Sequence, residues 1–279
     1  MTSRFVLPGG RFGCDSPADL VRLAFGAGWL VNVRGRMAGK DLRRWSTDAL
    51  SHLRVRLTVD GLEHIEPDTT YVVVANHESF LDPVALLQLP IRLGFVARDE
   101  LLEWPILDRY LGRDDHIVLC PERGLSALRV LLNEGARILG EGTSLVAFPQ
   151  GTMLGIETAF SVGPFELAMR ENVAVLPVAL SGGHNVWEYP FSPTVRYGRD
   201  MAMSVLPPIT VEDPYKSAEE VSKTIKSEVL PDPATRRFKP EIDGFWDGYR
   251  YEIDPSFPEL AETVASWRAG DDARRRQSS

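Results

Sequence analysis

The sequence predicts an α/β fold in which helices flank a largely parallel, mixed sheet. Short apolar runs typical of buried strands recur along the chain, and helical patterns stand between several of them. The run Tyr71–Ala75 is continuously apolar, as in a strand that is buried on both faces. The chain has 279 residues, of which 44% are hydrophobic and 25% charged, so it is long and apolar enough for a substantial core.

The first 53 residues are predicted to form a pair of helices. Ser16 followed by Pro17 is typical of a helix start, and apolar residues then recur at helical spacing as far as Val31. A second helix is expected over about residues 40–53, with an apolar stripe on one face and arginines on the other. We therefore expect an N-terminal helical segment, residues 1–53, ahead of the sheet.

Charge is unevenly distributed along the sequence. Residues 1–58 contain ten Arg and Lys, four Asp and no Glu, a net charge of +6, whereas the whole chain carries −8. Two interpretations stay open for this segment: a solvated basic face, or a peripheral contact with an anionic membrane surface. The acidic balance of the whole chain argues against nucleic acid as a partner.

Cysteine usage and apolar runs indicate the compartment. Cys14 and Cys120 are too few for a disulfide framework, which favours a reducing, intracellular environment. The start of the sequence lacks the apolar core of a signal peptide, and the stretch Leu20–Val31 is too short and too polar to span a bilayer. We expect a cytoplasmic protein that contacts the inner face of the membrane peripherally if the basic segment binds lipid.

Residues 54–230 are predicted to form one catalytic domain in which strands alternate with helices, without internal repeats. The expected strands are Val55–Val59, Tyr71–Ala75, Leu93–Ala97, Ile117–Cys120, Ser144–Phe148, Val173–Ala179, Thr194–Gly198 and Met201–Leu206. The expected helices are Val84–Leu89, Leu125–Leu139, Pro164–Arg170 and Ala218–Leu230.

Residues 231–279 predict an irregular, aromatic-rich C-terminal extension. Five prolines interrupt regular structure there, and the end of the chain is expected to be a frayed tail. The extension either covers part of the core or walls a hydrophobic pocket. Its aromatic residues are Phe238, Phe245, Trp246, Tyr249, Tyr251 and Phe257.

His77 is the strongest candidate for a catalytic side chain. It follows the strand Tyr71–Ala75, and functional groups gather beyond the carboxyl ends of strands in open α/β sheets. Asp82 stands five residues later and precedes Pro83, a position that suits a helix N-cap. A tight turn would bring this carboxylate to the imidazole, and such a pair can deprotonate a hydroxyl or an amine. The other four histidines have no comparable setting.

Five blocks of sequence occur in a specific order: Leu57–Ile65 (LTVDGLEHI), Asn76–Pro83 (NHESFLDP), Ala97–Gly112, Phe148–Thr152 (FPQGT) and Leu176–Val178 (LPV). Together they resemble the motifs of the 1-acylglycerol-3-phosphate acyltransferase family of glycerolipid acyltransferases, of which this chain would be a divergent member. The resemblance covers roughly residues 54–230, and it includes the family's histidine and aspartate five residues apart.

The resemblance implies direct acyl transfer from an acyl thioester, carried by coenzyme A or acyl carrier protein, to a small-molecule or lipid acceptor. It implies that His77 is the general base and that Asp82 orients it, without a metal ion or a cofactor. Main-chain N–H groups around Gly151 and Thr152 are candidates to stabilise the oxyanion, although Gly151 is equally well explained as a turn glycine. The candidate substrate-binding residues are Asn76, Ser79, Arg123, Gln150, Gly151 and Thr152.

The departures from the family pattern bear on the acceptor. Gln150 and Met153 replace a glutamate and an arginine, and Pro121 stands where the second motif has an arginine, with Arg123 two residues away as a substitute. Because the family's arginines hold the acceptor's phosphate, we expect a hydroxyl or amine acceptor, a lipid or a specialised metabolite, that is not a simple glycerol phosphate. The alternatives are acylation of 1-acylglycerol-3-phosphate with Arg123 as the phosphate contact, thioester hydrolysis, and a non-catalytic lipid- or carrier-binding module.

Overall fold

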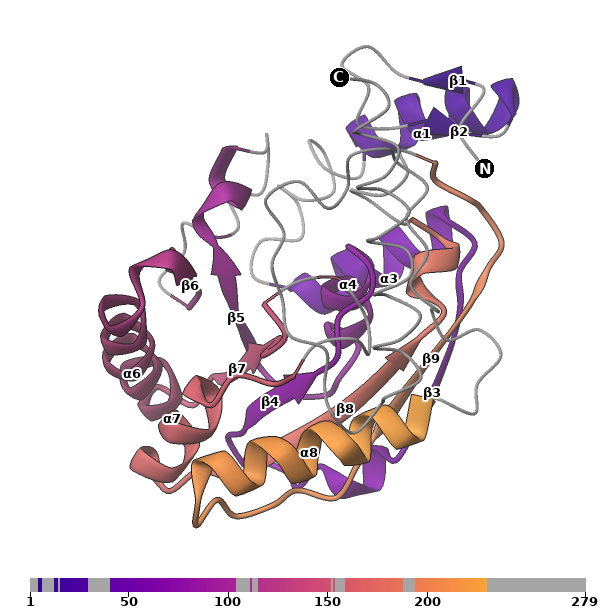
Figure 1. Cartoon of the computed structure of the whole chain (residues 1–279). Helices are drawn as coiled ribbons and strands as arrows, with labels where there is room; N and C mark the ends of the chain where they lie inside the picture. The colour runs from indigo at the N-terminus through magenta and orange to yellow at the C-terminus, as the bar shows by residue number, and fades with distance from the viewer. Residues whose placement is uncertain are drawn as a thin grey trace, which may run out of the picture.

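Seven strands form one sheet with helices on both faces in a computed structural model of the chain (Figure 1). Across the sheet the strands lie in the order β3 (Arg56–Asp60), β9 (Asp200–Val205), β8 (Val175–Ser181), β4 (Val72–Ala75), β7 (Ser144–Ala147), β5 (Leu93–Arg98) and β6 (Ile117–Leu119). The structure describes residues 5–6, 13–14, 16–29, 41–103, 111, 115–151, 153, 159–187 and 194–229. The predicted α/β class with a largely parallel, mixed sheet is confirmed.

The directions of the strands decide where the site lies. β8, β4, β7, β5 and β6 are mutually parallel, whereas β9 runs antiparallel to β8, and β3 is parallel to β9. The carboxyl ends of the five parallel strands therefore share one edge of the sheet. β8, β4 and β7 are direct neighbours, so residues that follow these three strands meet at the centre of that edge.

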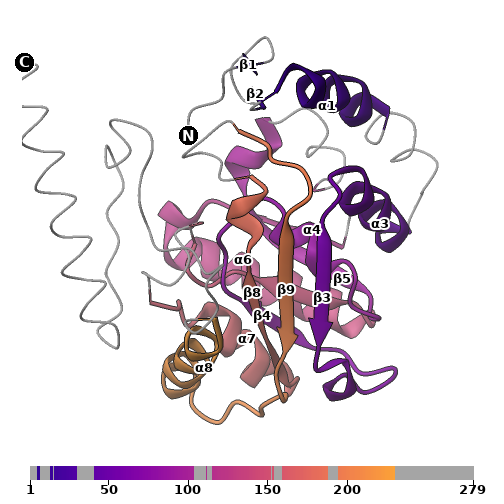
Figure 2. The ribbon, with the colours of Figure 1, turned by 90° about the vertical axis from the view of Figure 1, so that its right-hand side faces the viewer.

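Two hydrophobic clusters fill the space between the sheet and its helices, and β4 contributes to both. Val73 and Ala75 point to the face that is covered by α3 (Leu42–His52) and α4 (Asp82–Leu86). The alternate residues Val72 and Val74 point to the face covered by α6, α7 and α8. Figure 2 shows α3 and α8 on opposite sides of the sheet. The bounds of the other helices are α1 (Pro17–Trp29), α6 (Leu125–Gly140), α7 (Gly163–Glu171) and α8 (Pro214–Val229).

The N-terminal helix begins where the sequence predicts. The hydroxyl of Ser16 accepts the main-chain N–H of Asp19, and Pro17 is the first residue of α1. A two-stranded antiparallel ribbon, β1 (Phe5–Val6) with β2 (Gly13–Cys14), stands before this helix. None of the helices within the described ranges combines the length and the apolar character needed to cross a bilayer.

Two expectations on the domain's secondary structure are corrected. The segment Thr194–Gly198 forms only isolated bridges at its first two residues, because Gly198 takes a left-handed conformation that turns the chain before β9. Helix α8 begins at Pro214 rather than Ala218, since the Asp213 carboxylate accepts the main-chain N–H groups of the next turn. The aromatic-rich extension, residues 231–279, lies outside the described residues.

Candidate active site

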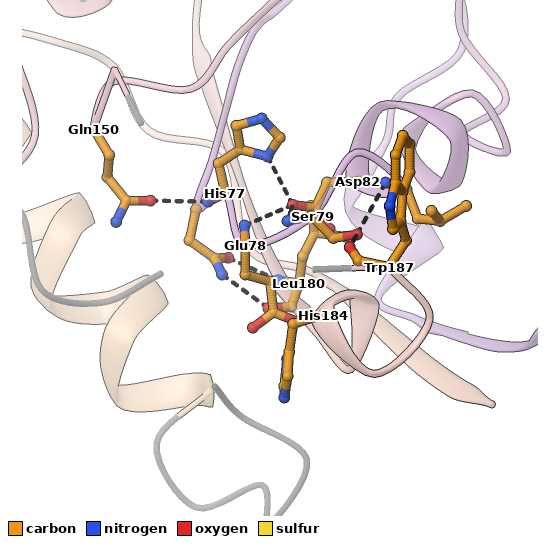
Figure 3. Close-up of polar contacts among 10 residues, drawn as sticks. His77, Glu78, Ser79, Asp82, Gln150, Leu180, His184 and Trp187 are labelled. Carbon is orange, nitrogen blue, oxygen red and sulfur yellow. Dashed lines mark hydrogen bonds and ion pairs between the residues drawn. The ribbon is translucent and has the colours of Figure 1, made fainter. Parts of the chain in front are cut away.

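His77 and Asp82 are in contact at the carboxyl end of β4. The strand ends at Ala75, and the loop that follows returns the chain so that His77 Nδ1 lies 2.7 Å from Asp82 Oδ2 (Figure 3). Asp82 is fully buried, whereas the His77 side chain remains 16% exposed. One ring nitrogen is thus held by a buried carboxylate, which leaves the other nitrogen to exchange a proton.

The Asp82 carboxylate is held by the loop that it closes. Its Oδ2 also accepts the main-chain N–H groups of Glu78 at 2.7 Å and Ser79 at 2.8 Å. Asp82 is the first residue of α4 and not its N-cap as expected, because Leu81 already takes a helical conformation. The carboxylate therefore caps the tight turn before the helix, and this turn fixes its distance from His77.

The His77 ring is flanked by residues that follow β7, the neighbouring strand. Phe148 stacks on the imidazole with ring centroids 4.0 Å apart and an angle of 18° between the planes. Gln150 Oε1 accepts the main-chain N–H of His77 at 2.8 Å. Gln150 is 9% exposed, and its Nε2 has no hydrogen-bond partner among the described residues. The amide thus anchors the backbone of His77 and has a donor that no described residue accepts.

Asn76 and Ser79 join the loop to β8 and to the segment after it. The Asn76 side chain donates to the carbonyl oxygen of Leu180 and accepts its N–H, both at 2.8 Å. The Ser79 hydroxyl donates to the carbonyl oxygen of Trp187 at 2.8 Å. Both side chains are buried and their polar groups are engaged within the protein, so the geometry gives them the task of holding the loop.

Sequence reasoning missed a second carboxylate–imidazole pair, which joins Glu78 of this loop to His184. His184 follows β8 in η5 (Gly183–Asn185), and its Nδ1 lies 3.2 Å from Glu78 Oε1. The expectation that only His77 has such a setting is therefore wrong. The sequence did hold a signal for His184, because this residue also follows a predicted buried strand. Its partner Glu78, however, is 106 residues away in the sequence.

Of the remaining residues that the sequence analysis names in these motifs, the structure describes Gly151, Arg123 and Met153 but not Thr152. Gly151 has φ 66° and its N–H donates to the carbonyl oxygen of Phe148 at 3.0 Å, which supports the turn-glycine interpretation over an oxyanion donor. Arg123 ends η4 (Pro121–Arg123) after β6; its exposed side chain is at the same edge of the sheet, three strands from β4. Met153 is half-buried, and Thr152 lies outside the described residues.

The described residues contain no group of three or more His, Cys, Asp and Glu side chains that could hold a metal ion. The chemistry that these residues themselves can perform is acid–base chemistry: a buried carboxylate orients an imidazole, and the imidazole can take a proton from a hydroxyl, an amine or water.

Comparisons with known proteins find similarity to acyltransferases. Residues 56–181 match the family model described as Acyltransferase. The chain is 28% identical over 215 residues to 1-acyl-sn-glycerol-3-phosphate acyltransferase alpha of Mus musculus, an overlap of 71% of this chain and 75% of the mouse protein. The corresponding human protein is 29% identical over 192 residues, an overlap of 63% of this chain and 68% of that protein.

A solved structure shares the fold. The crystal structure of the 1-acyl-sn-glycerophosphate acyltransferase PlsC from Thermotoga maritima matches with a TM-score of 0.64 and 22% identity, over 78% of this chain and 95% of that one. This likeness shows a shared fold, and the matches in sequence show that the chain is similar to acyltransferases, those named 1-acyl-sn-glycerol-3-phosphate acyltransferase among them.

Proposed function

We propose that this protein transfers an acyl group from an acyl thioester to a hydroxyl group by general-base catalysis at His77. The observation that carries the proposal is the 2.7 Å contact between His77 Nδ1 and the buried carboxylate of Asp82. The carboxylate holds the proton on Nδ1 and so directs the lone pair of Nε2 to the acceptor.

In the proposed reaction, His77 Nε2 takes the proton of the acceptor hydroxyl as its oxygen attacks the thioester carbonyl carbon. A C–O bond forms, and the carbonyl oxygen becomes an oxyanion. The C–S bond then breaks, the carbonyl is restored, and the imidazolium returns its proton to the leaving thiolate. Asp82 stabilises the imidazolium between these two steps, and no acyl-enzyme is formed.

For the acceptor, we propose 1-acylglycerol-3-phosphate. The relatives are named for this acceptor. We give their names more weight than the missing arginines, which argue against a simple glycerol phosphate as the acceptor. Arg123 is the candidate phosphate contact, because it is exposed at the same edge of the sheet as His77. In this proposal Gln150, being neutral, adds no negative charge beside an anionic acceptor.

A non-phosphorylated hydroxyl or amine acceptor is the second candidate. Two observations favour it: the Nε2 of Gln150 has no hydrogen-bond partner among the described residues, and Met153 can form no ion pair with a phosphate. A lipid or another small molecule that places a hydrogen-bond acceptor near Gln150 would satisfy that buried group.

The acyl donor is proposed to be acyl-coenzyme A or acyl carrier protein, since both present the same thioester to the dyad. The contact with a membrane is proposed to be peripheral and to involve α1. This helix exposes Phe25 by 78% and Val21 by 56% in a part of the chain that carries a net positive charge.

The function is tested by mass spectrometry of products from the purified full-length chain. Each donor is offered with 1-acylglycerol-3-phosphate, with its non-phosphorylated counterpart, and with no acceptor, and His77→Ala is the control. Acylated product that depends on His77 supports the proposal. Free fatty acid at the same rate with and without acceptor would assign thioester hydrolysis instead, and no turnover on any combination would favour a non-catalytic binding module.

A further inference from the structure

Outside the His77–Asp82 pair, the site contains the second buried pair, Glu78 with His184. Their side chains are 1% and 15% exposed, and Glu78 Oε1 lies 3.2 Å from His184 Nδ1. Figure 3 shows Glu78 and His184 on the opposite side of the loop from the His77 imidazole. Any influence of His184 on the His77 imidazole is therefore indirect.

We propose that His184 is a positioning residue for the catalytic dyad and that it acts through Glu78. This inference rests on the proposed function, in which His77 is the general base. The main-chain N–H of Glu78 donates to Asp82 Oδ2 at 2.7 Å, and this oxygen is the one that His77 Nδ1 contacts at 2.7 Å. By holding the Glu78 side chain, His184 fixes the residue whose N–H group aims the carboxylate.

The charges in the loop explain why such a partner is needed. Glu78 and Asp82 place two buried carboxyl groups four residues apart on one short turn. A buried carboxylate is strongly unfavourable unless it is hydrogen-bonded and compensated. His184 supplies a donor to Glu78, so that the side chain of this residue does not compete for the N–H groups that hold Asp82.

The segment around His184 packs directly on the dyad as well. A Cβ atom at Gly183 would lie 2.7 Å from Asp82 Oδ1 and 2.9 Å from the Ser79 Cβ atom, so only glycine fits there without displacing the carboxylate. Two residues of the loop, Ser79 and Glu78, bond to Trp187 and His184 in the segment that follows Gly183. A shift of the segment that follows β8 would therefore also displace the Asp82 carboxylate.

The proposal is tested with three substitutions at His184. His184→Asn keeps a donor at the place of Nδ1, His184→Leu removes it, and His184→Gln keeps a polar side chain but moves the donor to the place of Nε2. We expect the Asn variant to retain kcat, and the Leu and Gln variants to lose about 10- to 100-fold in kcat, a loss similar to that seen when the hydrogen-bond partner of a metal-binding histidine is removed. KM for the acyl donor should change little, because His184 lies away from the His77 imidazole.

His64→Leu is the matched control. The Nδ1 of His64 also makes a single part-buried hydrogen bond, to the carbonyl oxygen of Val205 at 2.8 Å. His64 follows β3, which runs opposite to β4, so it lies toward the other edge of the sheet. A purely structural contribution of a histidine should affect thermal stability in both Leu variants, whereas kcat should fall only for the variant at His184.

A readout that needs no turnover separates this inference from the proposed function. In proton NMR spectra, the Nδ1–H of His77, assigned by its loss in His77→Ala, reports the bond to Asp82. We expect this resonance to shift or broaden in His184→Leu and His184→Gln, and to persist in His184→Asn and His64→Leu. If the wild-type chain turns over none of the acceptors and the resonance still responds, the proposed function fails while the positioning role stands. An unchanged resonance in folded His184→Leu or His184→Gln, with kcat equal to that of the control, would overturn the inference.

Discussion

The ring of Phe148 stacks on the imidazole of His77, with the centroids 4.0 Å apart and the planes 18° from parallel. Together with the bond from Nδ1 to Asp82, this contact leaves the imidazole little freedom to rotate. The two constraints come from different strands, because Phe148 follows β7 and His77 follows β4. The pairing of these strands thus sets the orientation of the proposed base.

Replacement of His77 by alanine should abolish most of the turnover and leave the fold intact. A positioned general base contributes about 10²–10⁴-fold to the rate, and we expect kcat to fall by that factor. The side chain is partly exposed and sits on a loop, so the thermal transition should move little. Steady-state kinetics with a melting curve on the same sample measure both, and near-normal kcat in a folded variant would exclude His77 as the base.

Replacement of Asp82 should separate catalysis from stability. Asp82→Asn keeps an acceptor for the loop but loses the charge that stabilises the imidazolium, so kcat should fall on the order of 10²–10⁴-fold with a small change in stability. Asp82→Ala should in addition destabilise the fold, because the buried N–H groups of Glu78 and Ser79 lose their acceptor, at about 1–3 kcal/mol each.

Urea unfolding of the two Asp82 variants, compared with the wild type, measures this difference. Equal free energies of unfolding for the Asn and Ala variants would contradict the capping role of the carboxylate. Equal kcat for Asp82→Asn and the wild type would contradict its role in orienting His77.

The local part of the site was predictable from sequence. The five-residue spacing of His77 and Asp82 is a property of one loop, and a continuously apolar strand before it already places the loop at an edge of the sheet. The strands and helices were predictable to within a few residues for the same reason, since hydrophobic periodicity is a local signal. The prediction of a strand over Thr194–Gly198 was wrong, because the alternation of apolar residues does not reveal the left-handed conformation of Gly198.

The contacts between strands were not predictable from a single sequence. Phe148, Gln150 and His184 come close to the dyad only because β7 and β8 lie on the two sides of β4, an order that no sequence spacing encodes. The pairing of Glu78 with His184 joins positions 106 residues apart. The sequence around Gln150 indicates substrate binding, whereas its bond to the His77 backbone arises from the pairing of β4 with β7.

The role of Arg123 can be tested with a pair of acceptors. If this side chain contacts the phosphate of 1-acylglycerol-3-phosphate, Arg123→Ala should raise KM for that acceptor about 10- to 100-fold, the value of one hydrogen bond to a charged group. KM for the non-phosphorylated counterpart should stay unchanged. Arg129→Ala, which removes another exposed arginine nearby on α6, is the control. The same KM in Arg123→Ala and the wild type would refute the phosphate contact.

The contact between α1 and α3 should weaken in acid. Burial lowers the pKa of His52, and the nearby Arg22 guanidinium lowers it further. The ring of His52 lies so close to Gly26 of α1 that a Cβ atom there would be 1.9 Å from it, and its Nε2 is 3.2 Å from the Tyr197 hydroxyl. Burial raises the pKa of Tyr197 to about 12, so this hydroxyl stays protonated across the neutral and acidic range.

The sign of the effect follows from the lowered pKa of His52. The unfolded chain, with an ordinary histidine pKa of about 6.5, binds the proton more strongly than the folded chain does. The stabilisation from neutral His52 is therefore complete above about pH 6.5 and is lost as the pH falls through the lower, folded-state value. His52→Asn should lose less stability than the wild type between about pH 7.5 and about pH 5, as measured by urea unfolding. Parallel losses in the two proteins would show that His52 does not couple to folding.

Membrane association should depend on α1 and on salt. Phe25 and Val21 are exposed on this helix, and residues 1–58 carry a net charge of +6. The chain should float with vesicles that contain phosphatidylglycerol at about 0.1 M salt and less at about 1 M, since the Debye length shortens from about 10 Å to about 3 Å. Phe25→Glu should reduce flotation without destabilising the fold, because the side chain it replaces is 78% exposed.

Tyr215→Glu provides the comparison for Phe25→Glu. Tyr215 is 70% exposed on the first turn of α8, a helix that lies at the opposite end of the molecule from α1 in both views (Figures 1 and 2). Both variants add the same negative charge, so a general electrostatic effect on anionic vesicles would reduce flotation equally. A specific contact through α1 requires a larger loss for Phe25→Glu. Equal losses would assign the attraction to net charge alone, and no flotation of the wild type at low salt would exclude a peripheral membrane contact of this kind.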